Sequence, residues 1–181
     1  MEQIELEVIL SLLKNKELHV RGIAKSVKQP HANISRTMKK MLDSNIVDFR
    51  IMGKNKIFRL KNGIEALQYA HSAEQFKLLK LIERYPFLSV IVEGILSKTE
   101  EELVVIFGSF AKFNAKSDSD IDIFVETENR AIKTELEKIN SRISVKIGVF
   151  DKNNILIKEI IKDHVIIKGV EHFYEKNRIF D

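Results

Sequence analysis

The sequence of 181 residues has no cysteine, no tryptophan, two prolines and seven glycines. The absence of cysteine excludes disulfides, thiolate metal sites and cysteine nucleophiles, and it makes a reducing cytoplasm the expected compartment. The small number of prolines and glycines excludes collagen-like and low-complexity proteins. No apolar run approaches the ~18 residues that a membrane-spanning helix needs, so we expect no membrane partner. The amino-terminal segment is acidic and lacks the basic region of a secretion signal.

The residues that are present describe a globular protein with an uneven charge. Hydrophobic residues make up 44% and charged residues 31% of the chain, which is enough apolar material for a core. Residues 14–61 contain 13 Lys and Arg but only 3 acidic residues, a net charge of +10, whereas residues 62–181 carry a net charge of −3. A basic charge concentrated in one short segment indicates a surface that faces a polyanion, although a Lys-rich solvated surface has the same composition.

The first 62 residues have the pattern of a winged helix-turn-helix domain. Apolar residues recur first at helical spacing in three segments and then at a period of two in two strands, which cover residues 3–14, 20–27, 31–43, 46–51 and 56–60. Three helices followed by a hairpin is the element order of a winged helix. We therefore predict a DNA-binding domain of this class over residues 1–62.

The third predicted helix presents a polar and basic face opposite its apolar stripe. In a helix-turn-helix this helix enters the major groove of DNA, where arginine can read guanine, asparagine can read adenine and lysines suit phosphates. The hairpin adds further lysines. The predicted contacts to double-stranded DNA are Gln29, Asn33, Arg36, Lys39, Lys40, Lys54 and Lys56. A winged helix that contacts a protein is the alternative interpretation of the same surface.

Residues 63–85 predict a long helix that ends before Pro86, because the residue before a proline avoids the helical region. Its apolar stripe makes this helix either a packed linker or the interface of a homodimer. The stripe consists of Ile64, Leu67, Ala70, Ala73, Phe76, Leu79 and Ile82. Residues 86–181 alternate helices with short apolar strands: the helices cover 87–98, 129–140, 153–162 and 170–177, and the strands cover 103–107, 121–125, 143–150 and 165–167. The whole pattern predicts an α+β protein in which a linker helix joins the winged helix to a domain with a small mixed sheet.

The residues that could carry chemistry lie around the first two of these strands. Gly108 and Ser109 directly follow a buried strand, where a glycine lets the backbone approach a ligand and a serine hydroxyl at a helix start can hold a phosphate. Asp120 and Asp122 are two residues apart, so a strand points both carboxylates to one face. Mg²⁺ suits one or two carboxylates together with substrate phosphates. The combination indicates metal-assisted chemistry on a nucleoside triphosphate, with Mg²⁺ as the expected cofactor.

The same residues resemble the signature of a known family, the polymerase-beta-like nucleotidyltransferases, and in particular its minimal nucleotidyltransferase branch. The resemblance rests on Gly108, Ser109, Ala111, Lys112, Ser119, Asp120, Ile121 and Asp122. It covers roughly residues 87–175, and residues 159–174 look like the end of this domain in proteins that join it to a winged helix. The resemblance implies that Gly108, Ser109 and Lys112 bind the nucleotide, and that Asp120 and Asp122 are catalytic residues that hold Mg²⁺.

Two positions depart from the pattern of that family. Phe113 stands where the family often has a glycine after the basic residue. Active members also carry a third carboxylate on a later strand, but the non-core face of the predicted strand offers Ser144, Lys146, Gly148 and Phe150. Asp151 and Glu126 do not match the position of the missing acid by register. A lysine near the aspartates would also weaken the binding of Mg²⁺.

The sequence therefore favours a DNA-binding transcriptional regulator whose second domain binds a Mg²⁺-nucleotide. The first alternative is an active nucleotidyltransferase that moves a nucleoside monophosphate from a triphosphate onto a protein or a small molecule. The second alternative is an antitoxin-like partner of a helical toxin. The missing third acid favours the regulator, and the intact Gly108-Ser109 and Asp120/Asp122 set keeps the transferase open.

Overall fold

A computed structural model describes residues 1–177 and 180 of the protein. The chain divides into two compact units, of which the first covers residues 1–74 and the second begins at Gln75. The division falls inside the long helix α4 (Ile64–Arg84). Within the residues that the structure describes, no helix combines the length and the apolar character that crossing a membrane requires.

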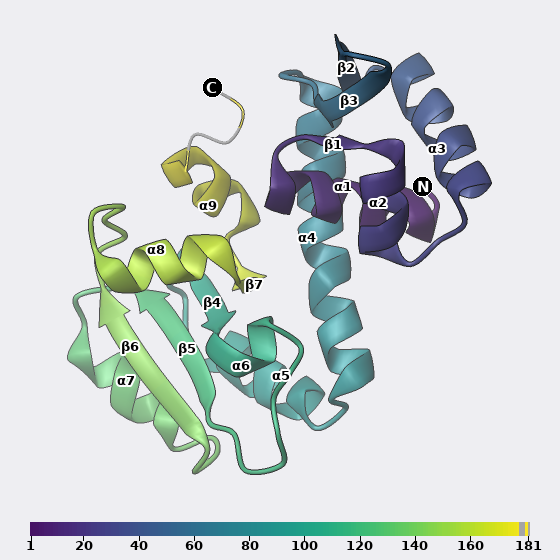
Figure 1. The fold of residues 1–181 in the computed structure, drawn as a ribbon. Coiled ribbons are helices and arrows are strands. Elements are labelled where there is room, and N and C mark those ends of the chain that lie inside the picture. The colour runs from purple at the N-terminus through teal and green to yellow at the C-terminus, as the bar shows by residue number, and fades with distance from the viewer. Residues whose placement is uncertain (178–179, 181) are drawn as a thin grey trace. The chain divides into compact units, whose positions relative to one another are not determined.

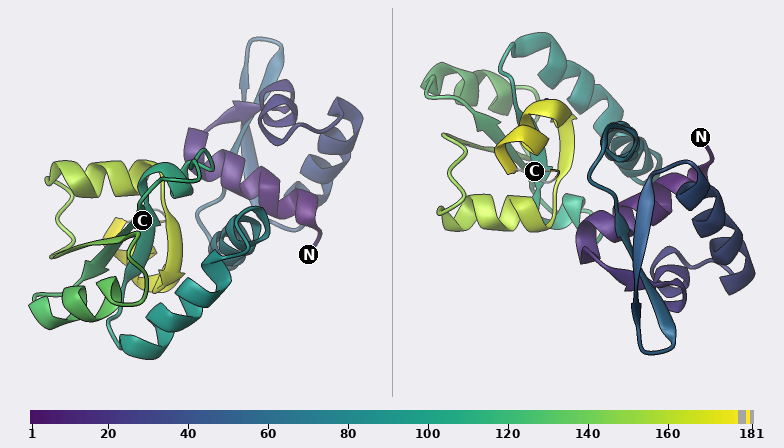
Figure 2. Two further views of the ribbon diagram at one scale, coloured as in Figure 1. Left: turned by 90° about the horizontal axis from the view of Figure 1, so that it is seen from below. Right: turned by 90° about the horizontal axis from the view of Figure 1, so that it is seen from above.

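The first unit contains three complete helices, a small antiparallel sheet and the first part of α4. Its elements are α1 (Gln3–Asn15), β1 (Leu18–His19), α2 (Val20–Val27), α3 (His31–Asp43), β2 (Val47–Met52) and β3 (Asn55–Leu60). The strand order is β1-β3-β2. The β2–β3 hairpin projects away from the three helices (Figure 2). The three helices and two of these strands lie where the periodicity predicts them, and the two-residue strand β1 is an addition.

Local sequence explains where α2 and α3 begin. His19 precedes α2, and its Nδ1 accepts the backbone N–H of Gly22 at 3.2 Å, which satisfies one of the free donors of the first turn. Pro30 precedes α3, where its missing N–H costs nothing. The predicted apolar stripe of α3 is buried at Ile34 and Met38, and this burial fixes which face of the helix is left for solvent.

One ion pair joins an exposed lysine of α3 to a carboxylate of α1 that is almost completely removed from water. The Nζ atom of Lys40 on α3 lies 2.8 Å from Oε1 of Glu5 and 2.9 Å from Oε1 of Glu2. The side chain of Glu5 is only 2% exposed. Burial by itself would raise the pKa of Glu5, but the hydrogen bonds from Lys40 and from the backbone N–H of Glu2 outweigh it and hold this pKa below its ordinary value.

The buried face of α4 differs from the predicted apolar stripe. Ala66, Ala70 and Ala73 are fully buried, whereas the larger Ile64 and Leu79 are 63% and 64% exposed. Ala70 and Ala73 are packed as predicted. Ile64 and Leu79 are not packed within the protein, which contradicts the packed-linker alternative at these two positions and leaves the homodimer alternative untested. Small side chains allow a helix backbone to approach its neighbours closely, so the alanines form much of the packed face, to which the fully buried Leu81 also belongs. The homodimer through this helix stays a prediction.

The second unit is built on a four-stranded mixed sheet. After the end of α4, its elements are α5 (Leu88–Lys98), β4 (Val104–Phe107), α6 (Gly108–Ala111), β5 (Ile121–Glu126), α7 (Arg130–Glu137), β6 (Ile143–Gly148), α8 (Ile155–Lys162), β7 (Val165–Lys168) and α9 (Val170–Asn177). The strand order is β6-β5-β4-β7. Strand β5 runs parallel to β6 and antiparallel to β4. This sheet confirms the predicted α+β domain with a small mixed sheet.

The two faces of this sheet have different roles. One face is apolar and packs with α5, α6 and α7 into the main core of the unit, to which the strands contribute Val104, Ile106, Ile121, Ile123, Val125, Ile143, Val145, Val165 and Ile167. The other face carries Asp122, Phe124 and Glu126 from β5, because alternate residues of a strand share a face. Helix α8 crosses the sheet at the carboxyl-terminal ends of β5 and β6 (Figure 1).

The Glu5–Lys40 pair gives a first testable prediction. Lys40→Met should lower the melting temperature, because the nearly buried carboxylate of Glu5 loses its partner. Lys39→Met is the matched control, since Lys39 is an exposed neighbour on the same helix. The pKa of Glu5 is depressed in the folded protein, so its stabilising contribution is present above its ordinary value of 4.5 and is lost as the pH falls through the folded pKa. The difference between parent and Lys40→Met in thermal melts should therefore shrink below pH 4. An equal effect of both substitutions at pH 7 would contradict this account.

Candidate nucleotide site and candidate nucleic-acid interface

The candidate nucleotide site begins where Gly108 meets Asp122. Strand β4 pairs with β5 so that Phe107 lies opposite Asp122, and the chain leaves β4 through Gly108 in the left-handed region, with φ of +70°. A Cβ atom on residue 108 would overlap with the carboxylate of Asp122. The left-handed backbone conformation favours glycine here, and a side chain at residue 108 would also displace the carboxylate of Asp122.

The carboxylates of Asp120 and Asp122 are close enough to affect each other. Burial is the first cause that raises the pKa of Asp122 above its ordinary value, and the charge of Asp120 raises it further. The positive charge of Lys146 acts in the opposite direction and is the weaker influence. The repulsion between two carboxylates at one edge of a partly buried site destabilises the folded protein locally, and a bound cation would remove this repulsion.

The loop before β5 is ordered by its own side chains. The hydroxyl of Ser119 accepts the backbone N–H of Lys116 at 2.8 Å, and the N–H of Ser119 donates to the carbonyl of Lys116 at 3.2 Å. Ser119 thus closes the turn that leads into Asp120. Phe113, in the position where the resembling family often has glycine, has a positive φ of 56°. The unusual residue is therefore held in a conformation that favours glycine, while its ring packs against the core.

The position beside Asp122 on the neighbouring strand belongs to Ser144. The parallel register pairs Asp122 with Ser144 and Phe124 with Lys146. Ser144 and Lys146 therefore share the face of Asp122, and neither is an acid. This agrees with the non-core face predicted from the sequence. Lys146 is exposed and lies near enough to attract Asp122.

The two remaining acids lie at the other end of the same strands. Glu126 is four residues beyond Asp122 on β5, which places it about 13 Å away at the usual rise of a strand. Its carboxylate is already engaged: Oε2 lies 2.7 Å from Nε2 of His172, and Oε1 lies 3.0 Å from Nζ of Lys176. Asp151 follows the carboxyl-terminal end of β6, where its Oδ1 accepts the N–H of Asn153 at 2.9 Å. Glu126 is thus engaged at the far end of β5, and Asp151 lies beyond the far end of β6, so the structure places neither acid beside Asp120 and Asp122.

The residues at the site could supply two oxygen ligands to Mg²⁺, Asp120 and Asp122, and not a complete set. In residues 1–177 and 180, no group of three or more His, Asp or Glu side chains is placed to hold a metal ion. Asp120 and Asp122 form a pair of oxygen ligands whose mutual repulsion favours a cation between them. Mg²⁺ commonly takes one or two protein carboxylates and completes its shell with phosphates and water. The pair therefore suits Mg²⁺ that arrives with a polyphosphate.

Comparison with known proteins finds one family similar to this part of the chain. Residues 91–172 match the family described as Polymerase beta, Nucleotidyltransferase. Residues 91–172 form a nucleotidyltransferase-like domain. The matched range contains Gly108, Ser109, Asp120 and Asp122, and it confirms the resemblance that these residues indicate. A search of curated proteins and a search of solved structures found no match.

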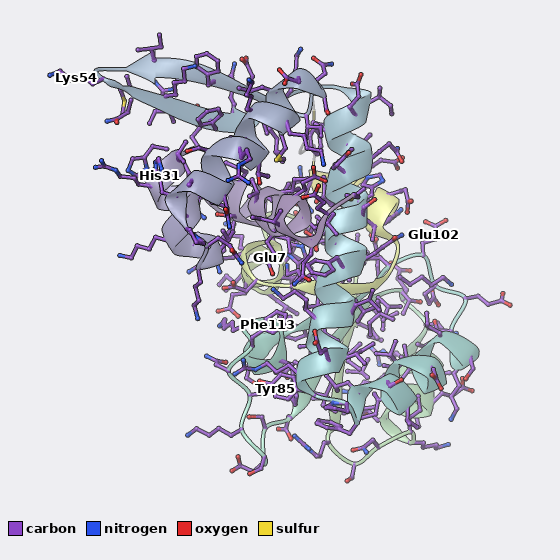
Figure 3. All side chains as sticks on the ribbon, turned by 90° about the vertical axis from the view of Figure 1, so that its right-hand side faces the viewer. Glu7, His31, Lys54, Tyr85, Glu102 and Phe113 are labelled. Carbon is purple, nitrogen blue, oxygen red and sulfur yellow. The ribbon has the colours of Figure 1, made fainter. Side chains whose placement is uncertain are left out.

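The first unit, outside the range of the nucleotidyltransferase-like match, presents the second candidate surface. Asn33, Arg36 and Lys39 are exposed on α3, while Gln29 is half-buried just before it. Figure 3 shows Lys54 at the tip of the hairpin. Between the hairpin and the starts of α2 and α3 lies a hollow lined by His19, Val20, Arg21, His31, Lys54, Asn55, Lys56 and Phe58. Three separate elements thus bring basic side chains to one concave place.

Some of the predicted basic contacts are engaged within the first unit. Lys40 pairs with Glu5 and Glu2, and Lys56 places its Nζ 4.1 Å from the ring centre of Phe49. Arg50, a basic residue of the hairpin outside the predicted set, pairs with Glu17, with Nη2 2.7 Å from Oε2. The pairings of Lys40 and Arg50 were not visible in the sequence, because their partners lie far away along the chain. Of the predicted DNA contacts, Lys40 is the one whose ammonium group the structure ties most closely to the protein itself.

Asp122 gives a testable prediction about the cost of the carboxylate pair. Its pKa is raised in the folded state, so the folded protein loses stability as the pH rises through the range between the unfolded and folded pKa values. Asp122→Asn should therefore melt at a higher temperature than the parent at pH 7 without added metal, and the difference should vanish near pH 3, where the parent carboxyl is also neutral. Asp118→Asn, an exposed aspartate in the preceding loop, should change neither value. A destabilised Asp122→Asn at pH 7 would show that burial of the charge and its repulsion by Asp120 do not dominate the stability at this position.

Proposed function

We propose that the nucleotidyltransferase-like domain binds a nucleoside triphosphate with Mg²⁺. The observation that carries this proposal is the approach of the Asp122 carboxylate to the backbone of Gly108, with Asp120 beside it. This contact brings the glycine-serine turn and the acidic pair, which are far apart in the sequence, to one place. In this arrangement Asp120 and Asp122 hold the metal, and the hydroxyl of Ser109 and the ammonium group of Lys112 bind the phosphates. When bound, Mg²⁺ supplies neutralising charge to the triphosphate.

The proposal includes weak or absent transfer activity. Transfer of a nucleoside monophosphate requires an acceptor hydroxyl to attack the α-phosphorus, with loss of its proton and departure of pyrophosphate. Active relatives use a third carboxylate to take that proton, and here Ser144 lies at the adjacent position. A serine hydroxyl is a poor base at neutral pH. The second candidate function is an active nucleotidyltransferase, which the family match over residues 91–172 favours.

We also propose that the first unit is a winged helix-turn-helix that binds double-stranded DNA, so that the whole chain acts as a regulator. The support is the net charge of +10 over residues 14–61, the exposed Asn33, Arg36 and Lys39 on α3, and the basic hollow beneath the hairpin. The two-fold symmetry of many DNA sites makes a homodimer the natural binding form.

Nucleotide binding is tested by thermal melts of the full chain with ATP, GTP, CTP and UTP, each with and without Mg²⁺. A triphosphate present at ~100 times its Kd should stabilise the fold by about 2.7 kcal/mol and raise the melting temperature by roughly 5–10 °C. The variant with both Asp120→Asn and Asp122→Asn should lose the Mg²⁺-dependent part of this shift.

Incubation with triphosphates labelled at the α-phosphate distinguishes the two candidate functions. Retained but untransferred label supports binding, and Mg²⁺-dependent labelling of a protein or small molecule establishes the transferase. No Mg²⁺-dependent shift with any of the four triphosphates would reject both.

DNA binding is tested by gel shifts and salt titrations with the full chain. Each phosphate that the protein neutralises releases counterions, so the affinity should fall steeply as salt rises. Arg36→Ala should weaken the binding free energy for the preferred sequence by roughly 1–3 kcal/mol if this side chain reads a base. Lys54→Ala should weaken the binding of all sequences alike.

Lys39→Ala should weaken binding more than Lys40→Ala, because the Lys40 ammonium already pairs with Glu5. Lys158→Ala, at an exposed position of α8, serves as the control for loss of one positive charge. Binding that is independent of salt, or equal losses in Lys54→Ala and Lys158→Ala, would remove the assignment.

A further inference from the structure

Arg142 contacts the aspartate-bearing segment with both its backbone and its side chain. It lies immediately before β6, and its carbonyl accepts the backbone N–H of Ile121 at 2.7 Å. Its guanidinium turns back toward the same segment, where Nη2 and Nε donate to the carbonyl of Ser119 at 2.6 and 3.1 Å. Asp120 is the residue between these two anchor points. A single arginine therefore holds the chain on both sides of Asp120.

The same guanidinium also touches the element that carries the glycine-serine turn. It lies 5.1 Å from the ring centre of Phe87 and 5.8 Å from that of Phe110. Phe110 is fully buried in α6 and directly follows Ser109. Tyr85 packs edge-on against Phe110 with ring centres 5.0 Å apart. The guanidinium thus rests on a fixed aromatic surface, and this surface belongs to the helical turn that bears Ser109.

We propose that Arg142 is a positioning residue that sets the place of Asp120 relative to Ser109 and Asp122, and so determines how well the site binds Mg²⁺ with a triphosphate. The proposal rests on the proposed nucleotide binding. Asp122 is held by the ladder of β5 and by its contact with Gly108. Asp120 precedes that strand at the end of an exposed loop, so it depends on other contacts for its position. Arg142 provides these contacts.

The chemistry of the contact calls for an arginine. The planar guanidinium can direct two N–H groups at one carbonyl while its face lies on aromatic rings, whereas an ammonium group is a compact point charge that cannot do both. Replacing a residue that holds a metal ligand in place through hydrogen bonds commonly lowers the metal affinity 10–100-fold. Arg142 occupies such a place for Asp120 without being a candidate ligand itself.

The test measures Mg²⁺-dependent binding of ATP, GTP, CTP and UTP to the full chain by calorimetry, and follows the triphosphate that the parent binds best. Arg142→Gln should weaken this binding 10–100-fold, and Arg142→Lys should recover only part of the loss. Arg130→Gln, which removes an exposed arginine from the start of α7, should bind as the parent does. In the Asp120→Asn background, Arg142→Gln should cause less than a two-fold further loss, because its effect passes through Asp120. A merely structural role would weaken binding equally in both backgrounds, and that result would overturn the proposal.

Hydrogen exchange supplies a readout that needs no nucleotide. The amides of residues 119–121 should exchange faster in Arg142→Gln and Arg142→Lys than in the parent, while those of β4 keep their rates. If Arg142→Gln does not fold, the binding and the exchange of Arg142→Lys decide. Parental binding by Arg142→Lys, or parental binding by Arg142→Gln, contradicts the inference and leaves nucleotide binding intact. Absence of Mg²⁺-dependent binding in the parent itself rejects the proposed function, and the role of Arg142 with it.

Discussion

The close approach of Asp122 to Gly108 is the constraint around which the nucleotidyltransferase-like domain is arranged. The antiparallel pairing of β4 with β5 brings Phe107 opposite Asp122, so the residue that follows β4 must pass directly by a carboxylate. Glycine can do this in a left-handed conformation without displacing that carboxylate. The chain then turns at once into α6, which presents Ser109 and buries Phe110. Pairing of two strands, one glycine and one buried ring therefore build the site before any ligand is present.

The directions of the strands divide the polar face of the sheet into two ends with different uses. Because β5 and β6 run in parallel, their first residues lie together and their last residues lie together. Asp122 and Ser144 meet at the first end. Glu126 lies at the last end, where His172 bridges it to Glu102, with Nδ1 of the imidazole 3.3 Å from Oε2 of Glu102. Burial would raise the pKa of Glu126, but Lys176, the N–H of Phe150 and His172 lower it below its ordinary value. This acid is used to fasten α9 to the sheet.

The sequence predicts most elements of this protein because their hydrophobic periods are clear. The helix over 31–43 and the strand that starts at Ile143 were located from spacing alone. The two-residue period of a strand also predicted that Ser144 and Lys146 lie on the non-core face of their strand, and that this face carries no acid beside Asp122. Predictions failed where the decisive partner was distant in sequence. The packed face of α4 depends on its alanines and not on Ile64 and Leu79, and no local pattern distinguishes the two.

The same limit applies to the basic residues. Lys39 and Lys40 are adjacent lysines on one helix, and the sequence does not distinguish them. Only the fold shows that Lys40 forms an ion pair with Glu5, which lies 35 positions earlier in the sequence. Arg142 is missed for a related reason. It lies outside the signature around Gly108 and Asp120, and an arginine before a strand has no special pattern. Its contacts with Ser119 and Phe110 exist only after β6 has paired with β5.

Electrostatics explains why such a site should depend on its ligand for most of its affinity for a cation. A set of three carboxylates would present three negative charges, whereas this site presents two, and the nearby ammonium of Lys146 offsets part of them. The raised pKa of Asp122 reports that burial and Asp120 still dominate over that lysine. Two carboxylates beside a lysine attract Mg²⁺ less than three carboxylates would, and Mg²⁺ gives up its bound water reluctantly. A triphosphate brings its own negative charge and its own oxygen ligands, so metal and nucleotide should bind to this site together, each improving the binding of the other.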